Sequence, residues 1–289
     1  MWRSRAKRPN SPLRARENNN KFIAYAKISF NEHASRYVVM IMYQLNKLTR
    51  PEVEEYLKKS DVVIFPVGST EQHGKHLAID NDAYTAGEIA RRVAERTGVL
   101  VAPTMPFGYS VHHMNFKGSI TLSFETLVSV YKEVCESLIH HGFKKIVVFN
   151  GHGGNTNPIM EALRRIRNDT GVKVYSLLVF PMKEGFGAKS LSVIKQESGG
   201  HACEMETSIS LYLGERVLLD KAEKWKQPRN TPKLEKDYGD KISLAYNFDE
   251  VTEIGSLGDP EAATSEKGRV LVDAVVEDIS NFIEELKTS

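Results

Sequence analysis

The sequence predicts an α/β protein with a mainly parallel β-sheet and helices on both of its faces. From residue 61 onward, short β-branched runs alternate with longer segments of helical periodicity. Such alternation implies right-handed crossovers, which place neighbouring strands parallel. The 289 residues suffice for one large α/β domain or two small ones. No internal repeat or long low-complexity linker favours two domains.

Four apolar runs are predicted to be strands, and each ends in a loop. The first, DVVIFPVG, is the kind of continuous apolar run that is buried on both faces of a sheet. The second passes into a loop that contains proline and glycine. The third ends in the loop NGHGGN. The predicted strands lie within residues 61–68, 99–108, 144–155 and 172–181.

Five helices are predicted between and after these strands. The first has Ala86, Ile89 and Val93 on one face and Gly98 as its stop signal, and Ser123 is the expected N-cap of the second. The polar segment 216–262 is expected to be an irregular excursion over the edge of the sheet that holds the strand exits. The predicted helices occupy residues 82–98, 123–142, 157–171, 206–215 and 268–287.

The charge of the chain is concentrated at its N-terminus. The net charge is +2, but residues 1–21 hold seven of the 39 basic side chains and one of the 37 acidic ones. The remainder therefore has 32 basic and 36 acidic side chains, and its mild acidity gives no basis for binding nucleic acid. Residues 1–41 are expected to be a basic, disordered extension, with a start at Met40 or Met42 or a nucleic-acid arm as alternatives. Residues 42–289 are expected to form the functional domain.

Compartment signals favour the cytoplasm. The N-terminal segment lacks the apolar stretch and cleavage site of a secretory signal. The run YVVMIMYQL at 37–45 is too short to cross a bilayer, so no membrane partner is expected. The two cysteines, Cys135 and Cys203, form no disulfide framework and suit a reducing compartment.

Metal-capable side chains follow two of the predicted strands. Glu71 and His73 follow the first strand and project to the same side if the backbone is extended. Asp82 comes nine residues after His73, and a carboxylate there can bridge two metal ions. His152 lies in the NGHGGN loop after the third strand. Since the carboxyl ends of parallel strands share one edge, we expect these four side chains to meet there.

A third cluster, HACEMETS, adds His201, Glu204 and Glu206. One glutamate is expected to complete a second metal site, and the other to orient a ligand or to act as an acid at a helix N-terminus. Mixed nitrogen and oxygen ligands favour zinc, manganese or iron over calcium or magnesium. Cys203 is a possible ligand, but a small buried thiol is the preferred interpretation.

Each feature also has a plain interpretation by itself. Glu71 and His73 alone could be a solvated loop, Asp82 could cap the following helix, and GHGG could be a tight turn. A coincidence of three such clusters at strand exits is what favours a metal site. His76, His112 and His113, and also Ser119 and Thr121, are candidates for substrate contact that the sequence does not decide.

The four motifs PVGSTEQHGKHLAIDND, FKGSITLS, NGHGGNT and HACEMETS, in this order, resemble the creatininase (creatinine amidohydrolase) family. The resemblance covers residues from about 43 to 285. It implies a three-layer α/β/α sandwich, a centre with two divalent metal ions, hydrolysis of non-peptide or cyclic amide C–N bonds, and a homohexamer. Zinc is the expected metal, with manganese and iron as alternatives.

The resemblance also implies roles for individual residues. Glu71 and His152 would hold one metal, His73 the other, and Asp82 would bridge them. His201 matches the family's catalytic histidine. Members that open creatinine have a metal-binding glutamate two residues after the loop histidine, where this chain has Gly154. Glu204 is the expected replacement, and Glu206 is then expected to have a catalytic role.

The expected reaction is hydrolysis of a small-molecule amide. A water activated between two metals attacks the carbonyl carbon, and His201 protonates the departing nitrogen. Creatinine-hydrolysing members close over their ligand with tryptophans, whereas this chain has only Trp2 and Trp225. One alternative is a formamide deformylase that acts on a pyrimidine nucleotide intermediate of flavin-type cofactor biosynthesis. Another is a non-catalytic, metal-stabilised oligomeric binding protein.

Overall fold

The computed structural model describes residues 43–289 except 197–198, 227, 229–230, 233, 235–240 and 242–243. These described residues belong to one compact unit. The predicted extension 1–41 lies outside the described residues, so its boundary with the domain stays a prediction. Within the described part of the chain, no helix has the length and apolarity needed to cross a membrane.

Four parallel strands form the central sheet in the order β2-β1-β3-β4. All four strands fall within the predicted ranges, and β2 takes up only two residues of 99–108 before the predicted loop begins. Pro103 and Pro106 follow it, and proline cannot donate a hydrogen bond to a neighbouring strand. The strands are β1 (Val62–Val67), β2 (Leu100–Val101), β3 (Lys145–Asn150) and β4 (Val174–Leu178).

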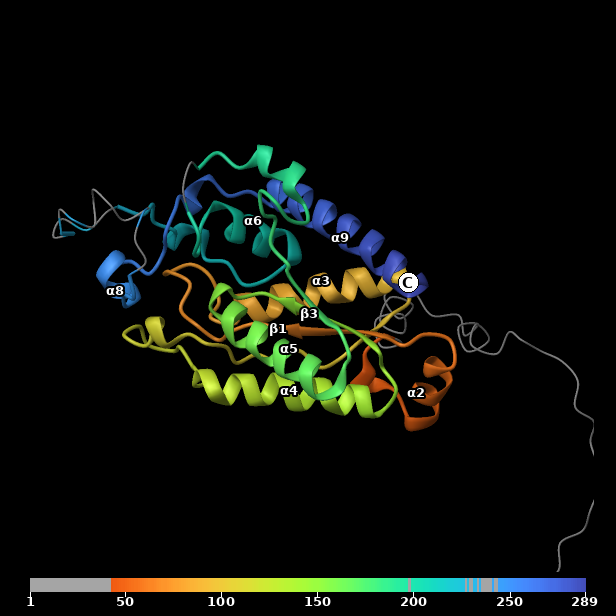
Figure 1. Ribbon diagram of the computed structural model, residues 1–289. Coiled ribbons are helices and arrows are strands. Elements are labelled where there is room, and N and C mark those ends of the chain that lie inside the picture. Colours follow the sequence, from red (N-terminus) through yellow and green to blue (C-terminus); the bar gives the residue numbers. More distant parts are fainter. Residues whose placement is uncertain are drawn as a thin grey trace, which may run out of the picture. The chain divides into compact units, whose positions relative to one another are not determined.

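Helices cover both faces of this sheet, as Figure 1 shows. Helices α3 (Asn81–Thr97), α6 (Glu204–Leu213) and α9 (Ser265–Thr288) belong to one layer, and α4 (Phe124–His140) and α5 (Thr156–Thr170) to the other. Alternate residues of β1 enter different cores: Val62 and Ile64 face the first layer, and Val63 and Phe65 the second. The predicted three-layer α/β/α sandwich is confirmed.

The signals that begin and end the helices act as the sequence indicates. Gly98 adopts the left-handed conformation directly after α3, and the Ser123 hydroxyl accepts the Thr126 N–H at the start of α4. Helix α6 begins at Glu204, two residues before the prediction. The other helices of the described residues are short: α2 (Arg50–Leu57), α8 (Phe248–Val251) and the 3-10 turns Leu45–Lys47, Val111–His113, Gly153–Asn155, Ala188–Val193, Leu219–Lys221 and Pro260–Ala262.

Two glycines let the first turn of α3 approach the ends of β1 and β3. A Cβ on Gly68 would lie 2.3 Å from the Ala83 nitrogen, and one on Gly151 would lie 2.3 Å from the Asp82 carbonyl oxygen. Any larger residue would therefore push α3 away from the sheet. The glycines thus bring Asp82 to the sheet edge where β1 and β3 end.

Candidate metal centre

Five buried side chains form two overlapping groups that share Asp82 and could each hold a metal ion; the third such group in the described residues, Glu71, His73 and His201, lacks Asp82. Glu71, Asp82 and His152 form the first group, and His73, Asp82 and Glu206 form the second. Within each group, one nitrogen or oxygen atom from every residue lies within 4.8 Å of the others. Asp82 is common to both groups, so the arrangement suits two neighbouring ions.

The two oxygens of Asp82 face different histidines. Oδ1 lies 3.1 Å from Nε2 of His73, and Oδ2 lies 3.1 Å from Nδ1 of His152. Within the described residues, His73 Nε2 and Asp82 Oδ2 are among the few buried polar side-chain atoms that have no hydrogen-bond partner. Burying such atoms without a partner is costly, and bound cations would satisfy both.

Both histidines present a lone pair to this cluster. The far nitrogen of His152, Nε2, lies 3.0 Å from the carbonyl oxygen of Tyr109, to which it donates its hydrogen. His73 donates from Nδ1 to the Glu71 carbonyl oxygen over 3.2 Å. A hydrogen bond from one ring nitrogen to a carbonyl fixes the other nitrogen as a lone-pair donor, as in metal-binding histidines. Nδ1 of His152 and Nε2 of His73 are therefore oriented for a metal.

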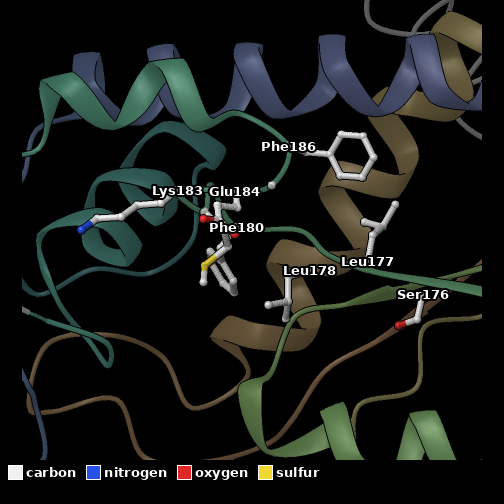
Figure 2. Close-up of a pocket in the computed structure, with 9 residues that line it drawn as sticks. Ser176, Leu177, Leu178, Phe180, Lys183, Glu184 and Phe186 are labelled. Carbon is white, nitrogen blue, oxygen red and sulfur yellow. The ribbon is translucent and has the colours of Figure 1, made fainter. Parts of the chain in front are cut away.

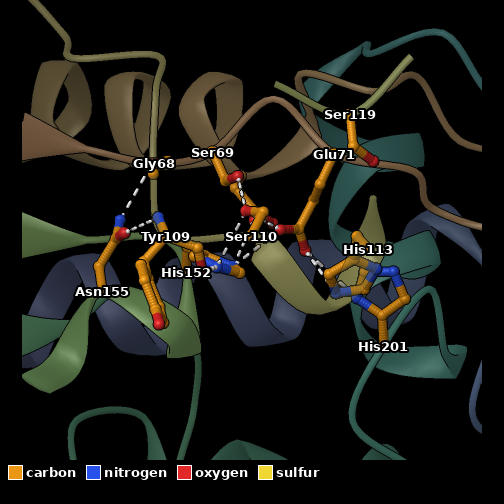
Figure 3. A network of polar contacts seen from close by, with 12 residues as sticks. Gly68, Ser69, Glu71, Tyr109, Ser110, His113, Ser119, His152, Asn155 and His201 are labelled. Atoms are coloured by element: carbon orange, nitrogen blue, oxygen red, sulfur yellow. Dashed lines mark hydrogen bonds and ion pairs between the residues drawn. The ribbon is translucent and has the colours of Figure 1, made fainter. Parts of the chain in front are cut away.

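Glu71 is held in place by serines that sequence reasoning missed. Ser110 donates to Glu71 Oε2 over 2.5 Å, and Ser69 lies 2.5 Å from the same hydroxyl (Figure 3). Oε2 is also 3.3 Å from His152 Nδ1. Ser110 comes from the loop between β2 and α4, where no motif marks it. Its contact with Glu71 depends on how two separate loops fold against each other, which the sequence does not indicate.

Asn155, the last residue of NGHGGN, joins three loops that surround the cluster. Its Nδ2 donates to the Gly68 carbonyl oxygen over 2.9 Å, and its Oδ1 accepts the Tyr109 N–H over 2.9 Å (Figure 3). These partners follow β1 and β2, while Asn155 follows β3. The amide therefore fixes the loop that carries Glu71 relative to the loop that carries His152.

Without a bound cation, the buried carboxylates draw protons onto the histidines. Burial opposes charge on His73, but Asp82 raises its pKa to about 10, and Glu71 together with Asp82 raises the pKa of His152 to about 9 against the same burial. These imidazoles hold the pKa of Asp82 below its ordinary value despite burial. Burial raises the pKa of Glu206 to about 7. Metal ions would take the place of these protons.

Glu204, the expected metal ligand, lies outside this cluster. One oxygen accepts the backbone N–H groups of Lys195 and Gln196 over 2.9 and 2.8 Å, and the other pairs with the ammonium of Lys267 on α9. Glu206 instead faces His73 and Asp82. Glu206, which we predicted to be catalytic, therefore belongs to a metal-capable group, whereas Glu204 is paired with Lys267 and two backbone N–H groups.

Aromatic rings border the cluster on one side. The ring of His201 lies 4.2 Å from that of His73, and its Nδ1 is 3.6 Å from Glu71 Oε1. His113 lies 4.6 Å from the His201 ring. Phe248 of α8 packs against both, with ring centroids 4.2 Å from His113 and 4.7 Å from His201. The predicted excursion 216–262 therefore brings α8 over the site.

The other candidates have structural partners. Ser119 accepts the Gln72 N–H over 3.1 Å, and Thr121 accepts the Ser110 N–H over 2.9 Å, so both shape the loops. Lys75 pairs with Glu223 over 2.6 Å. Cys203 is buried and stands outside the metal-capable groups of the described residues, and burial raises the pKa of its thiol to about 11.

A cavity of about 640 Å³ lies beside β4 and the loop that follows it (Figure 2). Leu177, Leu178, Phe180 and Phe186 give it a largely apolar wall, and Lys183 also belongs to its lining. Its lining includes no residue of the metal-capable groups. The candidate site is therefore the histidine and carboxylate cluster.

His76 predicts a pH dependence of stability. It is buried, with Nε2 2.9 Å from the Thr207 hydroxyl, and burial lowers its pKa from 6.5 to about 4. The neutral ring is favoured on folding, so its stabilisation is present above pH 6.5 and lost as the pH falls toward 4. Relative to His76→Gln, the wild type should lose roughly 2 to 3 kcal/mol of unfolding free energy between pH 7 and pH 4. Urea unfolding of both metal-free proteins tests this, and parallel pH profiles would contradict it.

Comparison with known proteins gives the family. The profile of the creatininase family, described as creatinine amidohydrolase, matches residues 46–283. A mycofactocin precursor peptide peptidase from Mycobacterium ulcerans (strain Agy99) is 30% identical over 233 residues, which cover 75% of this chain and 82% of the relative. Creatinine amidohydrolase from Pseudomonas putida is 28% identical over 263 residues, covering 83% and 96%.

Solved structures agree with this assignment. A crystal structure of creatinine amidohydrolase has a TM-score of 0.72 at 26% identity, covering 86% of this chain and 99% of that protein. A Zn–Zn form of a creatininase mutant has a TM-score of 0.71 at 26% identity, and a Mn form has 0.72 at 27%, with the same coverage. The relatives named above are hydrolases that act on amide bonds, and this chain belongs to the creatininase (creatinine amidohydrolase) family.

Proposed function

We propose that this protein is an amide hydrolase with a centre for two divalent metal ions, zinc first, with manganese or iron as alternatives. Glu71, Asp82 and His152 would hold one ion, and His73, Asp82 and Glu206 the other. The observation that carries the proposal is the division of the two Asp82 oxygens between His73 and His152, each 3.1 Å away. The zinc and manganese forms of creatininase support this choice of metals.

Two divalent ions supply, when bound, an activated water and polarisation of a carbonyl group. The protein's own contribution is to orient the ligands and to move a proton. His201 presents Nδ1 toward Glu71 Oε1, next to the cluster. From there it accepts a proton from the attacking water and returns it to the departing nitrogen, which is a very poor leaving group without that proton.

Replacing His201 by Ala is expected to separate metal binding from turnover. His201 is not needed in either of the two groups that share Asp82, so the variant should retain its metal. Loss of the proton carrier should lower kcat by roughly 10² to 10⁴-fold. Metal analysis and initial rates on the same preparation test both parts. An undiminished rate would remove His201 from the mechanism.

Gly154 is expected to be required for metal binding although it offers no ligand. A Cβ there would lie 2.4 Å from His152 Nε2 and 2.4 Å from the Tyr109 carbonyl oxygen, breaking the hydrogen bond that orients His152. Gly154→Ala should weaken metal affinity roughly 10 to 100-fold. Gly153→Ala is the matched control, because its Cβ would meet no atom within 4 Å. Equal affinities in the two variants, measured by competition with a chelator, would contradict this.

The proposed substrates are small molecules with a non-peptide or cyclic amide C–N bond. Creatinine itself is disfavoured as a substrate because members that open it close over it with tryptophans. Here Trp225 donates its ring N–H to the Val251 carbonyl oxygen, and Phe248 packs at the site instead of a tryptophan. Trp2 lies outside the described residues. A hydrolysis screen of creatinine, cyclic ureides, formamides and short peptides with zinc- or manganese-loaded protein tests the reaction class. Absence of hydrolysis across the panel would contradict it.

A second candidate is the trimming of a peptide. It is favoured by the relative from Mycobacterium ulcerans, which is a mycofactocin precursor peptide peptidase. This chain aligns with 82% of the length of that relative. Release of a terminal residue from short peptides, with no turnover of the cyclic amides, would favour this candidate over the first.

Formamide deformylation of a pyrimidine nucleotide is a third possibility, which we rank lower. The phosphate of such a substrate would need basic partners, and Lys224, Lys226 and Arg229 are the candidates in the segment 216–262. Lys224 pairs with Asp259 over 2.7 Å, and Arg229 lies outside the described residues. Release of formate from formylated aminopyrimidine nucleotides tests this alternative directly.

The proposal includes a cytoplasmic location and a homo-oligomer, hexameric by family resemblance. Sedimentation of the metal-loaded protein measures the subunit number. A non-catalytic, metal-stabilised binding protein is the alternative of another class. Metal that resists exchange, together with no hydrolysis across the panel, would favour that alternative.

A further inference from the structure

Gln72, between Glu71 and His73, has a side chain whose orientation is fixed. The residue is buried, and its Oε1 lies 3.0 Å from the backbone nitrogen of Gly74. A backbone N–H can only donate, so the atom that faces it is the amide oxygen. The Nε2 group of Gln72 must then face the other way, toward His113 and His201.

The amide determines where His113 carries its proton. Gln72 Nε2 lies 2.9 Å from His113 Nδ1, and an amide nitrogen can only donate. Nδ1 of His113 is therefore the acceptor, and the ring hydrogen is on Nε2. That nitrogen lies 3.5 Å from Glu71 Oε1, so His113 presents an N–H toward the metal-capable cluster.

The backbone of Gln72 determines the proton of His201. Nε2 of His201 lies 2.7 Å from the Gln72 carbonyl oxygen and 3.1 Å from the Gln72 side-chain nitrogen. Two lone pairs would repel strongly at the shorter distance, so His201 Nε2 carries a hydrogen and donates it to the carbonyl, and the Gln72 amide gives its hydrogen bond to His113 and not to His201. Nδ1, which faces Glu71 Oε1, keeps its lone pair.

Packing holds both rings in these orientations. His113 is buried between His201, 4.6 Å away, and Phe248, 4.2 Å away. Phe248 also packs edge-on against His201 at 4.7 Å. A ring flip of either histidine would break its hydrogen bond to Gln72, and so one arrangement of donors and acceptors is selected.

We propose that Gln72 is a positioning residue that holds both His113 and His201 with their hydrogen on Nε2. The two rings are turned in opposite directions, so that Nε2 of His113 faces the cluster and Nε2 of His201 faces away from it. The cluster then faces a lone pair from His201 and an N–H from His113. The catalytic consequence rests on the proposed function: His201 accepts a proton, while the N–H of His113 donates to the amide oxygen as negative charge develops on it. The placement of the protons does not depend on turnover.

The first test reads the protons directly. Protein labelled with 15N-histidine and loaded with zinc is examined by long-range 1H–15N NMR, with ring signals assigned from His113→Gln and His201→Gln. Both rings should carry hydrogen on Nε2 and a bare Nδ1. Hydrogen on Nδ1 of either ring would overturn the proposal. This result is independent of any substrate, so it is distinguishable from a failure of the proposed function.

The second test exchanges the donor for an acceptor. In Gln72→Glu, the carboxylate can still accept the Gly74 N–H but now also accepts from His113, so the hydrogen of His113 should move to Nδ1 while His201 is unchanged. On the amide that the wild type hydrolyses, kcat should fall roughly 100-fold, the effect of losing one oxyanion donor, with bound metal unchanged. An unchanged kcat, or a His113 Nδ1 that stays bare, would overturn the proposal.

A double variant separates positioning from a merely structural effect. The Nε2 group of a glutamine can occupy nearly the same place as Nε2 of histidine, and its amide has no tautomer to be reset. In a His113→Gln background, Gln72→Glu should therefore lower kcat less than threefold. A full 100-fold loss in this background would show that Gln72 acts on the structure and not through His113, which contradicts the proposal.

Discussion

Replacing Asp82 by Asn is expected to remove both metal ions and nearly all activity. The two oxygens of Asp82 face different histidines, and the residue belongs to two of the three metal-capable groups of the described residues. An amide offers one neutral oxygen in place of a shared negative charge, so neither ion would retain its full set of ligands. Loss of several kcal/mol of transition-state stabilisation corresponds to a fall in kcat/KM of roughly 10³-fold or more.

Asp80→Asn is the matched control for this change. Asp80 is exposed at the start of α3, and its side chain caps no N–H of the helix. Asp80→Asn removes the same charge two residues before Asp82, and this variant should keep both ions and full activity. Metal content by mass spectrometry, measured on both variants after dialysis, distinguishes them. Two bound ions in Asp82→Asn would contradict the bridging role.

The two glutamates at the start of α6 are expected to have separable effects. Glu206→Gln should lose the second ion with little change in folding, because Glu206 faces His73 and Asp82. Glu204→Gln should keep both ions and lower the free energy of unfolding by about 3 kcal/mol, because it breaks a buried pair with Lys267. Metal content and urea unfolding of the two variants give the test.

Each variant of this pair serves as the control for the other. Both change one buried carboxylate to an amide, within the first turn of the same helix. If Glu204→Gln lost an ion while Glu206→Gln kept both, the original sequence-based assignment would be restored and the geometry described here would be contradicted.

Most of the fold could be predicted because it depends on local patterns. The apolar run 62–67 is buried on both faces, as a continuous hydrophobic strand in a parallel sheet should be. Gly98 and Ser123 mark helix ends through their own backbone and hydroxyl chemistry. The prolines in 102–108 indicate that β2 passes into a loop, but hydrophobicity alone does not show that the strand has only two residues.

Only the site residues that directly follow a strand could be predicted from the sequence. Glu71 and His152 follow neighbouring strands, and the order of the sheet brings them to one edge. The choice between Glu204 and Glu206 depends on how α6 is rotated. In the structure Glu204 pairs with Lys267, 63 positions along the chain, and no local motif indicates this partner. Ser110 and Phe248 reach the site in the same non-local way.

The central claim is that Asp82 lies between two metal ions, with Glu206 as a ligand of the second. Anomalous diffraction from crystals of the zinc-loaded protein tests it most directly. Two zinc peaks are expected roughly 3.5 to 4 Å apart, one beside Glu71 and His152, the other beside His73 and Glu206, with one Asp82 oxygen on each. A single peak, or a second zinc bound by Glu204, would contradict it.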